Sequence, residues 1–311
     1  MNLNFERTSL IFTPLFTLFA LLFGGYFAKR LRILKQKQAT TFLNFVVFFA
    51  LPCLIFDKVY HLNFDFSLIL FAFMGFLSCV VAAFFALVLG FLFQFTQATL
   101  ASMFLLSCFS NNLFIGLPIV AGIYEDTQAL SVLVFYDILA TTLPISLFGT
   151  LILSLASKNQ VNFKENIKKI FTFPPFLALL FAFFCRFFHL NEVIFAPIRL
   201  LGDSTTAIAL FAIGLGFSFK TIKTSYKAAM IVIIAKMILA PLLFILLLKI
   251  FNFDFKQNLI VCIIACATPT MVLAGVMVMR AKLDSNLAVS VIAFSTLFTF
   301  INMPILLNFL I

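Results

Sequence analysis

Two proline-containing segments inside apolar runs carry the side chains best suited to bind a ligand. In the first, Asn111 and Asn112 precede Pro118, and in the second a Thr-Pro-Thr sequence is centred on Pro269. Proline lacks the backbone N–H and clashes with the preceding helical turn, so in lipid such segments persist only where protein or water satisfies the freed carbonyls. Amides and hydroxyls can donate hydrogen bonds to a carboxylate. The predicted substrate-binding residues are Asn111, Asn112, Gly116, Pro118, Thr268, Pro269 and Thr270.

The two segments are expected to break their helices and to meet near the middle of the membrane. The N-termini of the resulting half-helices would point partial positive charge at one spot, which suits an anion. One asparagine is expected to bind substrate while the other bonds a neighbouring helix. The remaining prolines within spans, Pro144, Pro241 and Pro304, are interpreted as simple kinks.

Charged residues inside apolar runs are costly and need partners. Asp137 and Lys236 lie at similar depth in their runs and have opposite sign, so an ion pair between them is predicted. Two alternatives remain open. Either Asp137 carries a proton during transport with Lys236 as the competing positive charge, or Lys236 holds the carbonyl end of a broken helix. Asp203, beside hydroxyl residues, is interpreted as a helix N-cap, with a gate as the alternative.

Membrane-spanning helices must position these side chains, because the composition excludes a soluble fold. Of 311 residues, 64% are hydrophobic and 10% charged, and mean hydropathy is +1.19. A soluble domain has about 45–50% apolar and about 25% charged residues. A span needs about 20 residues, and the apolar runs are continuous, which favours helices over a barrel. The predicted spans are 8–28, 38–57, 66–93, 98–123, 128–155, 172–189, 194–219, 226–250, 256–279 and 284–310.

The spans fall into two halves of five. Residues 1–156 form the first half, the polar stretch 157–171 is the linker, and residues 172–311 form the second half. Pro118 and Pro269 both lie in the fourth span of their half. An odd number of spans per half gives the halves opposite polarity, which is the inverted repeat of secondary transporters. The fold class is therefore an all-α polytopic membrane protein with broken, crossing fourth and ninth helices.

The net charge of +10 is interpreted as an orientation signal rather than as a nucleic-acid surface. Fourteen of the 21 basic residues fall in loops after odd-numbered spans. Because cytoplasmic loops collect Lys and Arg, both termini are predicted outside the cytoplasm. The six cysteines form no CxxC pair and there are two histidines, so neither a metal site nor a cofactor is expected. No nucleophile–base constellation points to an enzyme.

The sequence resembles the auxin efflux carrier family, which includes plant auxin exporters and bacterial malonate and malate permeases. The fourth span matches through Asn111, Gly116, Leu117, Pro118, Gly122, Tyr124 and Asp126. Further matches, along the whole chain, are Leu51-Pro52, Pro174-Pro175, Leu201–Ser204, Ala209–Gly214, Lys236 before Pro241, Pro269, Ser295-Thr296 and Pro304.

The resemblance implies ten helices in two inverted five-helix repeats. It implies a scaffold domain of helices 1, 2, 6 and 7, and a transport domain of helices 3–5 and 8–10 in which the two broken helices bind the substrate carboxylate. It also implies a homodimer that works by an elevator motion. Asn111 takes the role of the crossover asparagine. The long central loop of many plant exporters is absent, which favours bacterial organic acids over auxin.

We therefore predict a secondary transporter of a small organic anion, such as a mono- or dicarboxylate, embedded in the lipid of the bacterial inner membrane. A sodium-coupled bile-acid-type carrier is the alternative within transport, although no cluster of acidic and hydroxyl ligands for Na⁺ is apparent. A membrane sensor or scaffolding subunit is the alternative outside transport, and the lack of a soluble output domain argues against a sensor.

Overall fold

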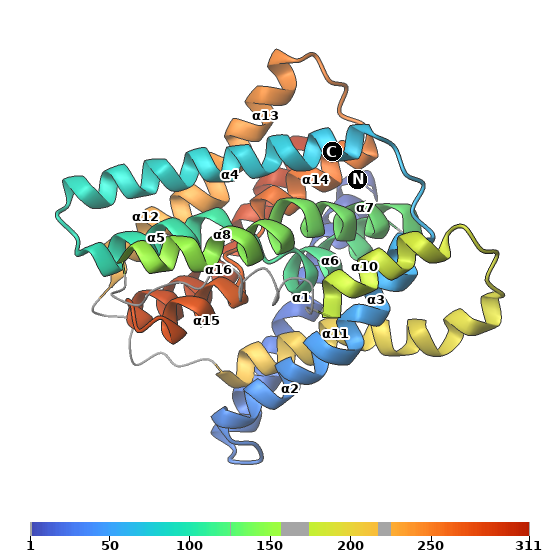
Figure 1. The fold of residues 1–311 in the computed structure, drawn as a ribbon, viewed down its shortest axis with the longest axis horizontal. Coiled ribbons are helices and arrows are strands. Elements are labelled where there is room, and N and C mark those ends of the chain that lie inside the picture. The colour runs from blue at the N-terminus through green and yellow to red at the C-terminus, as the bar shows by residue number, and fades with distance from the viewer. Residues whose placement is uncertain (1, 125, 157–173, 217–224, 311) are drawn as a thin grey trace. The chain divides into compact units, whose positions relative to one another are not determined.

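In the computed structural model, regular secondary structure in the described residues is helical (Figure 1). The structure describes residues 2–124, 126–156, 174–216 and 225–310, so the predicted linker 157–171 lies outside them. The α-helices are α1 (Asn2–Arg30), α2 (Ala39–Phe45), α3 (Leu51–Tyr60), α4 (Ser67–Leu92), α5 (Gln97–Cys108), α6 (Leu117–Ile123), α7 (Thr127–Asp137), α8 (Leu143–Ala156), α10 (Pro174–Cys185), α11 (Phe195–Gly216), α12 (Tyr226–Ile234), α13 (Ala240–Ile250), α14 (Gln257–Ala267), α15 (Val272–Arg280) and α16 (Ser285–Leu310).

Many of these helices join into longer apolar runs. Six runs in the described residues are long and apolar enough to cross a membrane: Gln36–Tyr60, Ser67–Leu92, Thr127–Gly149, Glu192–Gly216, Tyr226–Ile250 and Ser285–Leu310. Four shorter apolar helices accompany them: Gln97–Cys108, Asn112–Ile123, Pro174–Cys185 and Gln257–Ala267. The spans predicted at 98–123 and 256–279 are thus each two shorter helices, as the prolines indicated.

Widened π-helical turns precede four of the prolines. A proline ring clashes with the carbonyl four residues earlier, and a π turn relieves that clash inside a continuing helix. The helices continue through Pro144, Pro241 and Pro304, which agrees with their interpretation as kinks. The π turns and the prolines that follow them are Val46–Ala50 before Pro52, Asn112–Gly116 before Pro118, Ile138–Thr142 before Pro144, and Ala235–Leu239 before Pro241.

The chain folds as two compact units, each built from several separate segments. Unit 1 comprises residues 1–64, 113–135 and 169–217, and unit 2 comprises residues 65–112, 136–168 and 218–311. Unit 1 therefore contains α1–α3, α6, α10 and α11, whereas unit 2 contains α4, α5, α8 and α12–α16. Most of α7 belongs to unit 1, and its last two residues belong to unit 2.

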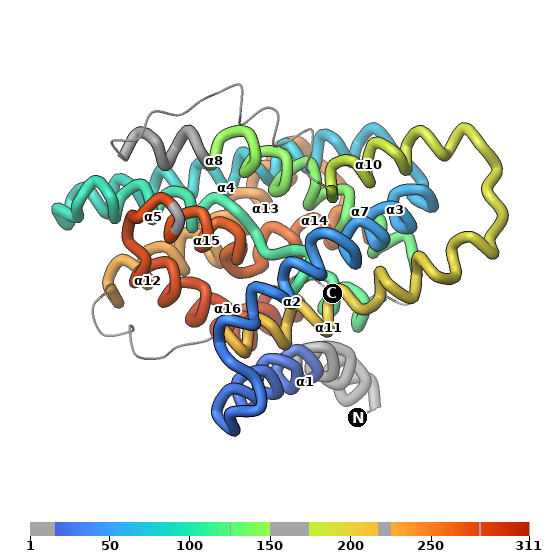
Figure 2. The backbone as a smooth tube through the Cα atoms, turned by 60° about the horizontal axis from the view of Figure 1, so that its bottom comes forward, coloured from blue at the N-terminus to red at the C-terminus, as the bar shows by residue number. Residues whose placement is uncertain are grey.

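In unit 1, glycines allow α1 and α11 to pack closely (Figure 2). A methyl group added at Gly25 would overlap the carbonyl oxygen of Phe211, and one added at Gly214 would overlap the carbonyl oxygen of Leu22. Small residues at the contact let helix backbones approach, which is how membrane helices gain packing energy without a hydrophobic driving force. The two glycines therefore permit close backbone contact between these helices.

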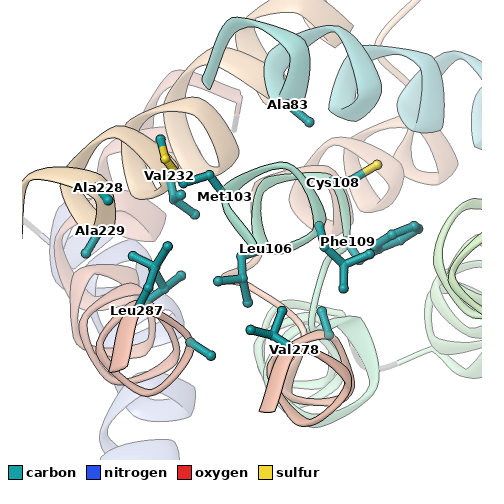
Figure 3. Close-up of a cluster of buried hydrophobic side chains, with 14 of the residues drawn as sticks. Ala83, Met103, Leu106, Cys108, Phe109, Ala228, Ala229, Val232, Val278 and Leu287 are labelled. Atoms are coloured by element: carbon teal, nitrogen blue, oxygen red, sulfur yellow. The ribbon is translucent and has the colours of Figure 1, made fainter. Parts of the chain in front are cut away.

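In unit 2, α5 packs against α4, α8, α12, α15 and α16. Leu106 of α5 lies between Leu287 of α16 and Val278 of α15, and Val232 of α12 joins the same cluster (Figure 3). Interdigitated apolar side chains of this kind hold a fixed arrangement because cores are close-packed. The cluster anchors the helix whose C-terminal end leads into the first break.

Candidate functional site

The two breaks pair with each other inside unit 2. The chain leaves α5 in an extended conformation at Phe109, and it leaves α14 in an extended conformation at Thr268. Ser110 and Thr270 form an antiparallel bridge. The backbone N–H of Asn111 donates to the carbonyl of Pro269 at 2.8 Å, and the N–H of Met271 donates to the carbonyl of Phe109 at 2.9 Å. We call the segments 109–112 and 268–271 the crossover.

The first break lies earlier than its proline suggested. Pro118 is in the first turn of α6, whereas the extended residues are Phe109–Asn111. The pairing at the crossover satisfies backbone groups that a broken helix would otherwise leave exposed to lipid. Gly116 and Pro118 belong to unit 1, while the other five predicted site residues lie at the crossover in unit 2.

Side chains complete the hydrogen bonding of the two interrupted helix ends. The Thr270 hydroxyl donates to the carbonyl of Leu106 at 2.9 Å, near the end of α5. At the end of α14, the Lys236 ammonium donates to the carbonyl of Cys266 at 2.6 Å. A cation at a helix C-terminus also opposes the negative end of the helix dipole. Both breaks are therefore stabilised by specific hydrogen bonds from side chains.

The two asparagines have different surroundings, although both are buried. Asn112 accepts a hydrogen bond from the Thr268 hydroxyl at 2.7 Å and donates to the Thr141 hydroxyl at 3.3 Å. The side-chain nitrogen of Asn111 is buried and has no hydrogen-bond partner among the described residues. Ser107, on the last turn of α5, also has a buried hydroxyl without such a partner. Asn112 thus links the two crossover segments, while the side-chain N–H groups of Asn111 remain available to a ligand.

Replacing Thr270 with valine is expected to lower the free energy of unfolding by about 1–3 kcal/mol, because the Leu106 carbonyl loses its donor in a buried position. The measurement is the apparent melting temperature of the purified protein.

Thr296→Val is the matched control, because Thr296 is equally buried but its hydroxyl donates at 2.7 Å to Ile292, four residues back in its own helix. That carbonyl keeps its helical N–H partner, so the control variant is expected to melt close to the wild type. Equal melting of both variants would contradict a capping role for Thr270.

The predicted ion pair between Asp137 and Lys236 is wrong. Lys236 is fully buried and bonds Cys266, which confirms the alternative that it holds a carbonyl end. Asp137 accepts a hydrogen bond from the Thr142 hydroxyl at 2.8 Å. Within the described residues, no basic side chain lies within ion-pair distance of Asp137. Similar depth in two spans does not determine which way the side chains point, and here they point to different partners.

The prediction that Asp203 is an N-cap is also wrong. The helix begins at Phe195, and Asp203 lies exposed well inside it. The neighbouring Ser204 does not end the helix, because its hydroxyl donates back to the carbonyl of Leu201 at 2.6 Å. Asn191 instead caps the short 3-10 turn before α11, by accepting from the N–H of Val193. The gate interpretation of Asp203 stays a prediction.

A charge cluster in unit 1 was missed by the sequence analysis. Asp57 near the end of α3 is 3% exposed and bonds Nε of Arg199 on α11 at 2.9 Å. Arg199 also pairs with Glu192, and Lys58 and His61 lie within ion-pair distance of Asp57. The signal was available, since the acidic Asp57 directly follows an apolar run.

Two features of unit 2 were also missed. Thr141 and Thr142 form one oxygen-rich group with Asn112 and Asp137. Two adjacent threonines in an apolar span do not by themselves indicate such a group in the sequence. Cys79 of α4 lies against Cys266, although the two are far apart in the chain. Only the tertiary packing of α4 on α14 brings these groups together.

Apolar helical runs and two broken helices that pair at a buried polar crossover are the architecture of a multi-pass membrane protein. The chain belongs to the family described as "Membrane transport protein", the family of the auxin efflux carriers, which it matches over residues 10–307. The predicted family resemblance is thereby confirmed.

Known relatives agree with this assignment. An uncharacterized transporter of Methanocaldococcus jannaschii is 26% identical over 286 residues, which cover 88% of this chain and 91% of the relative. An uncharacterized transporter of Methanothermobacter thermautotrophicus is 26% identical over 293 residues, covering 90% and 92%. The mouse lysosomal cholesterol signaling protein is 28% identical over 263 residues, which cover 75% of this chain but 29% of that protein. The chain is a membrane transporter.

Proposed function

We propose that the protein is a secondary transporter of a small organic anion, such as a mono- or dicarboxylate, and that Asn111 donates to the substrate carboxylate. The observation that carries the proposal is the buried amide nitrogen of Asn111 at the crossover, without a partner in the described residues. A buried donor left unpaired is costly. A ligand oxygen would satisfy it, and among ligands an anion gains most from donors in a low-dielectric site.

Charge at the crossover supports an anionic substrate. The helix α15 begins at Val272, directly after the second break, and its first N–H groups carry partial positive charge. The ammonium of Lys236 is bonded to Cys266, only two residues before Thr268. Both features favour negative charge here. Thr268, Pro269 and Thr270 would contribute shape and backbone groups, since both threonine hydroxyls already donate within the protein.

We further propose an elevator mechanism in which unit 2 carries the substrate. The compact clustering of unit 2, which holds the crossover, supports a rigid moving body. The resemblance assigns helices 3–5 and 8–10 to the transport domain, and unit 2 contains most of these. Residues 113–135, which the resemblance also assigns to transport, cluster with unit 1.

The inverted ten-helix repeat is part of the same proposal. The two broken segments support it, because each has a helix, an extended break and a second helix in the same order: α5 and α6 in the first half, α14 and α15 in the second. The inner-membrane location, the external termini and the homodimer stay predictions.

Two alternatives remain to be tested. The first is the sodium-coupled bile-acid-type carrier, which the oxygen-rich group around Asp137 supports, because a carboxylate and hydroxyl oxygens are the ligands of a hard cation. A sensor or scaffolding subunit would transport nothing. Flux in proteoliposomes that contain only this chain separates transport from the second alternative.

The substrate class is tested by thermal stabilisation. A ligand that binds the native state at about 100 times its Kd adds about 2.7 kcal/mol to stability, so malonate, malate or a related carboxylate is expected to raise the apparent melting temperature. Malonamide is the matched uncharged control for malonate. If a full panel of mono- and dicarboxylates leaves the melting temperature unchanged, or if malonamide stabilises equally, the organic-anion proposal fails.

A further inference from the structure

Two cysteine side chains are in contact close to the crossover. The sulfurs of Cys79 on α4 and Cys266 on the last turn of α14 are 3.7 Å apart. The two residues are 3% and 0% exposed. They come from segments far apart in the chain that unit 2 brings together. Two thiols in contact can lose a proton and an electron each and form a disulfide.

A lysine lies against the same pair. The Lys236 nitrogen is 3.7 Å from the Cys79 sulfur and 2.6 Å from the carbonyl oxygen of Cys266. Reactive cysteines lie beside cationic side chains, because the thiolate is the nucleophile and a neighbouring cation stabilises it. Such cysteines are usually also partly exposed, and buried cysteines in apolar surroundings are inert; Cys79 is buried but has the neighbouring lysine. The lysine therefore makes Cys79 the attacking thiol of the pair.

We propose that Cys79 and Cys266 form a redox-active dithiol that a peroxide oxidises to a disulfide. A peroxide such as H₂O₂ is small and uncharged, so burial among apolar helices does not exclude it as it excludes charged reagents. The site lies outside the substrate-binding role proposed for Asn111, and its chemistry does not depend on that role.

The reaction has two steps. The Cys79 thiolate attacks one peroxide oxygen, the S–O bond forms, the O–O bond breaks, and the leaving hydroxide takes a proton to become water. The Cys266 sulfur then attacks the sulfenic sulfur of Cys79, the S–S bond forms, and the S–O bond breaks. The hydroxyl group leaves with the Cys266 proton as a second water. Two thiols are oxidised by two electrons in total, and one peroxide is reduced to two waters.

The disulfide would change the crossover. A disulfide has sulfurs about 2 Å apart, so the pair must approach by about 1.7 Å from its present 3.7 Å. Cys266 lies two residues before Thr268, so the end of α14 must shift or rotate. Lys236 would lose the Cys79 thiol as a partner. If the proposed transport function holds, oxidation is therefore expected to inhibit transport, and a reductant is expected to restore it.

The test uses the purified full chain, treated with H₂O₂, quenched with catalase, alkylated under denaturing conditions and digested for mass spectrometry. The wild type is expected to lose two of its six thiols and to yield one peptide pair linked through Cys79 and Cys266. Cys262→Ser is the matched control, because Cys262 is also buried and lies one turn earlier on α14. It is expected to form the same link, whereas Cys79→Ser and Cys266→Ser form none.

Six unmodified thiols in the treated wild type, or a link that joins any other pair, would overturn the proposal. Because the readout is a covalent bond, a protein that forms the bond but moves no organic anion would refute the transport proposal alone. Transport that is normal before oxidation, lost with the bond and restored by dithiothreitol would support both.

Discussion

Replacing Asn111 with alanine is expected to weaken substrate binding by about ten- to a hundredfold, with the protein still folded and present at wild-type abundance. A hydrogen bond to a charged group contributes about 1.5–3 kcal/mol, and each 1.4 kcal/mol is tenfold in affinity. The free amide nitrogen is the group that this variant removes. The measurements are ligand-induced stabilisation and uptake into proteoliposomes.

The stability of the Asn111 variant distinguishes binding from folding. Because the amide nitrogen makes no hydrogen bond among the described residues, its removal relieves an unsatisfied donor, and the ligand-free variant is expected to melt at or above the wild-type temperature. Functional sites commonly carry such a cost in stability.

The adjacent asparagine provides the matched control. Asn112 bonds both Thr141 and Thr268, so Asn112→Ala removes two buried hydrogen bonds, one of which joins the two crossover segments, and is expected to lower the melting temperature. If Asn111→Ala binds and transports like the wild type, or if the two variants melt alike, the assignment of substrate binding to Asn111 is wrong.

The sequence predicted that both helices break because the causes are local, although the first break lies earlier than Pro118. Proline cannot continue a helical hydrogen-bond ladder, and adjacent amides in lipid need partners, so Asn111, Asn112 and Pro269 could be found without a structure. The split between the two asparagines, one for structure and one for substrate, was also expected. Which asparagine bonds a neighbouring segment became visible only with Thr268 and Thr141 in place.

The incorrect pairing of Asp137 with Lys236 has a cause that is general for membrane helices. Membrane helices are apolar on nearly all sides, so their pattern does not indicate which face a given residue occupies. Depth along the span suggested that Asp137 and Lys236 meet, but depth is independent of rotation about the helix axis. The same ambiguity hid the contact between Cys79 and Cys266. The Asp203 prediction failed because hydroxyl residues can bond back within a helix and need not end it.

Replacing Asp137 with asparagine is expected to abolish gradient-driven accumulation while transport down the gradient continues. Asp137 is 1% exposed, and its carboxylate accepts from Thr142 but, among the described residues, has no cationic partner. A lone buried carboxylate costs several kcal/mol, and binding of a proton or a metal cation would relieve that cost. We propose that this cation is the coupling ion.

The position of Asp137 links such an ion to the substrate site. Thr142 bonds Asp137, the adjacent Thr141 bonds Asn112, and Asn112 bonds Thr268 at the crossover. Binding or release of a cation at the carboxylate would therefore change a hydrogen-bonded group that includes Asn112, the residue next to Asn111. Coupling of this kind needs a contiguous physical connection with two arrangements.

The experiment measures the accumulation ratio of the anion in proteoliposomes under an imposed proton gradient and, separately, under a sodium gradient. The gradient that drives the wild type identifies the ion. In the Asp137→Asn variant the side-chain amide oxygen can still accept from Thr142, so the variant is expected to fold. The amide cannot carry the negative charge. The accumulation ratio of the anion is therefore expected to fall to its equilibrium value under either gradient. Asp254→Asn, which neutralises an exposed aspartate between α13 and α14, is the matched control and should accumulate like the wild type. Undiminished accumulation by Asp137→Asn would show that the coupling ion binds elsewhere.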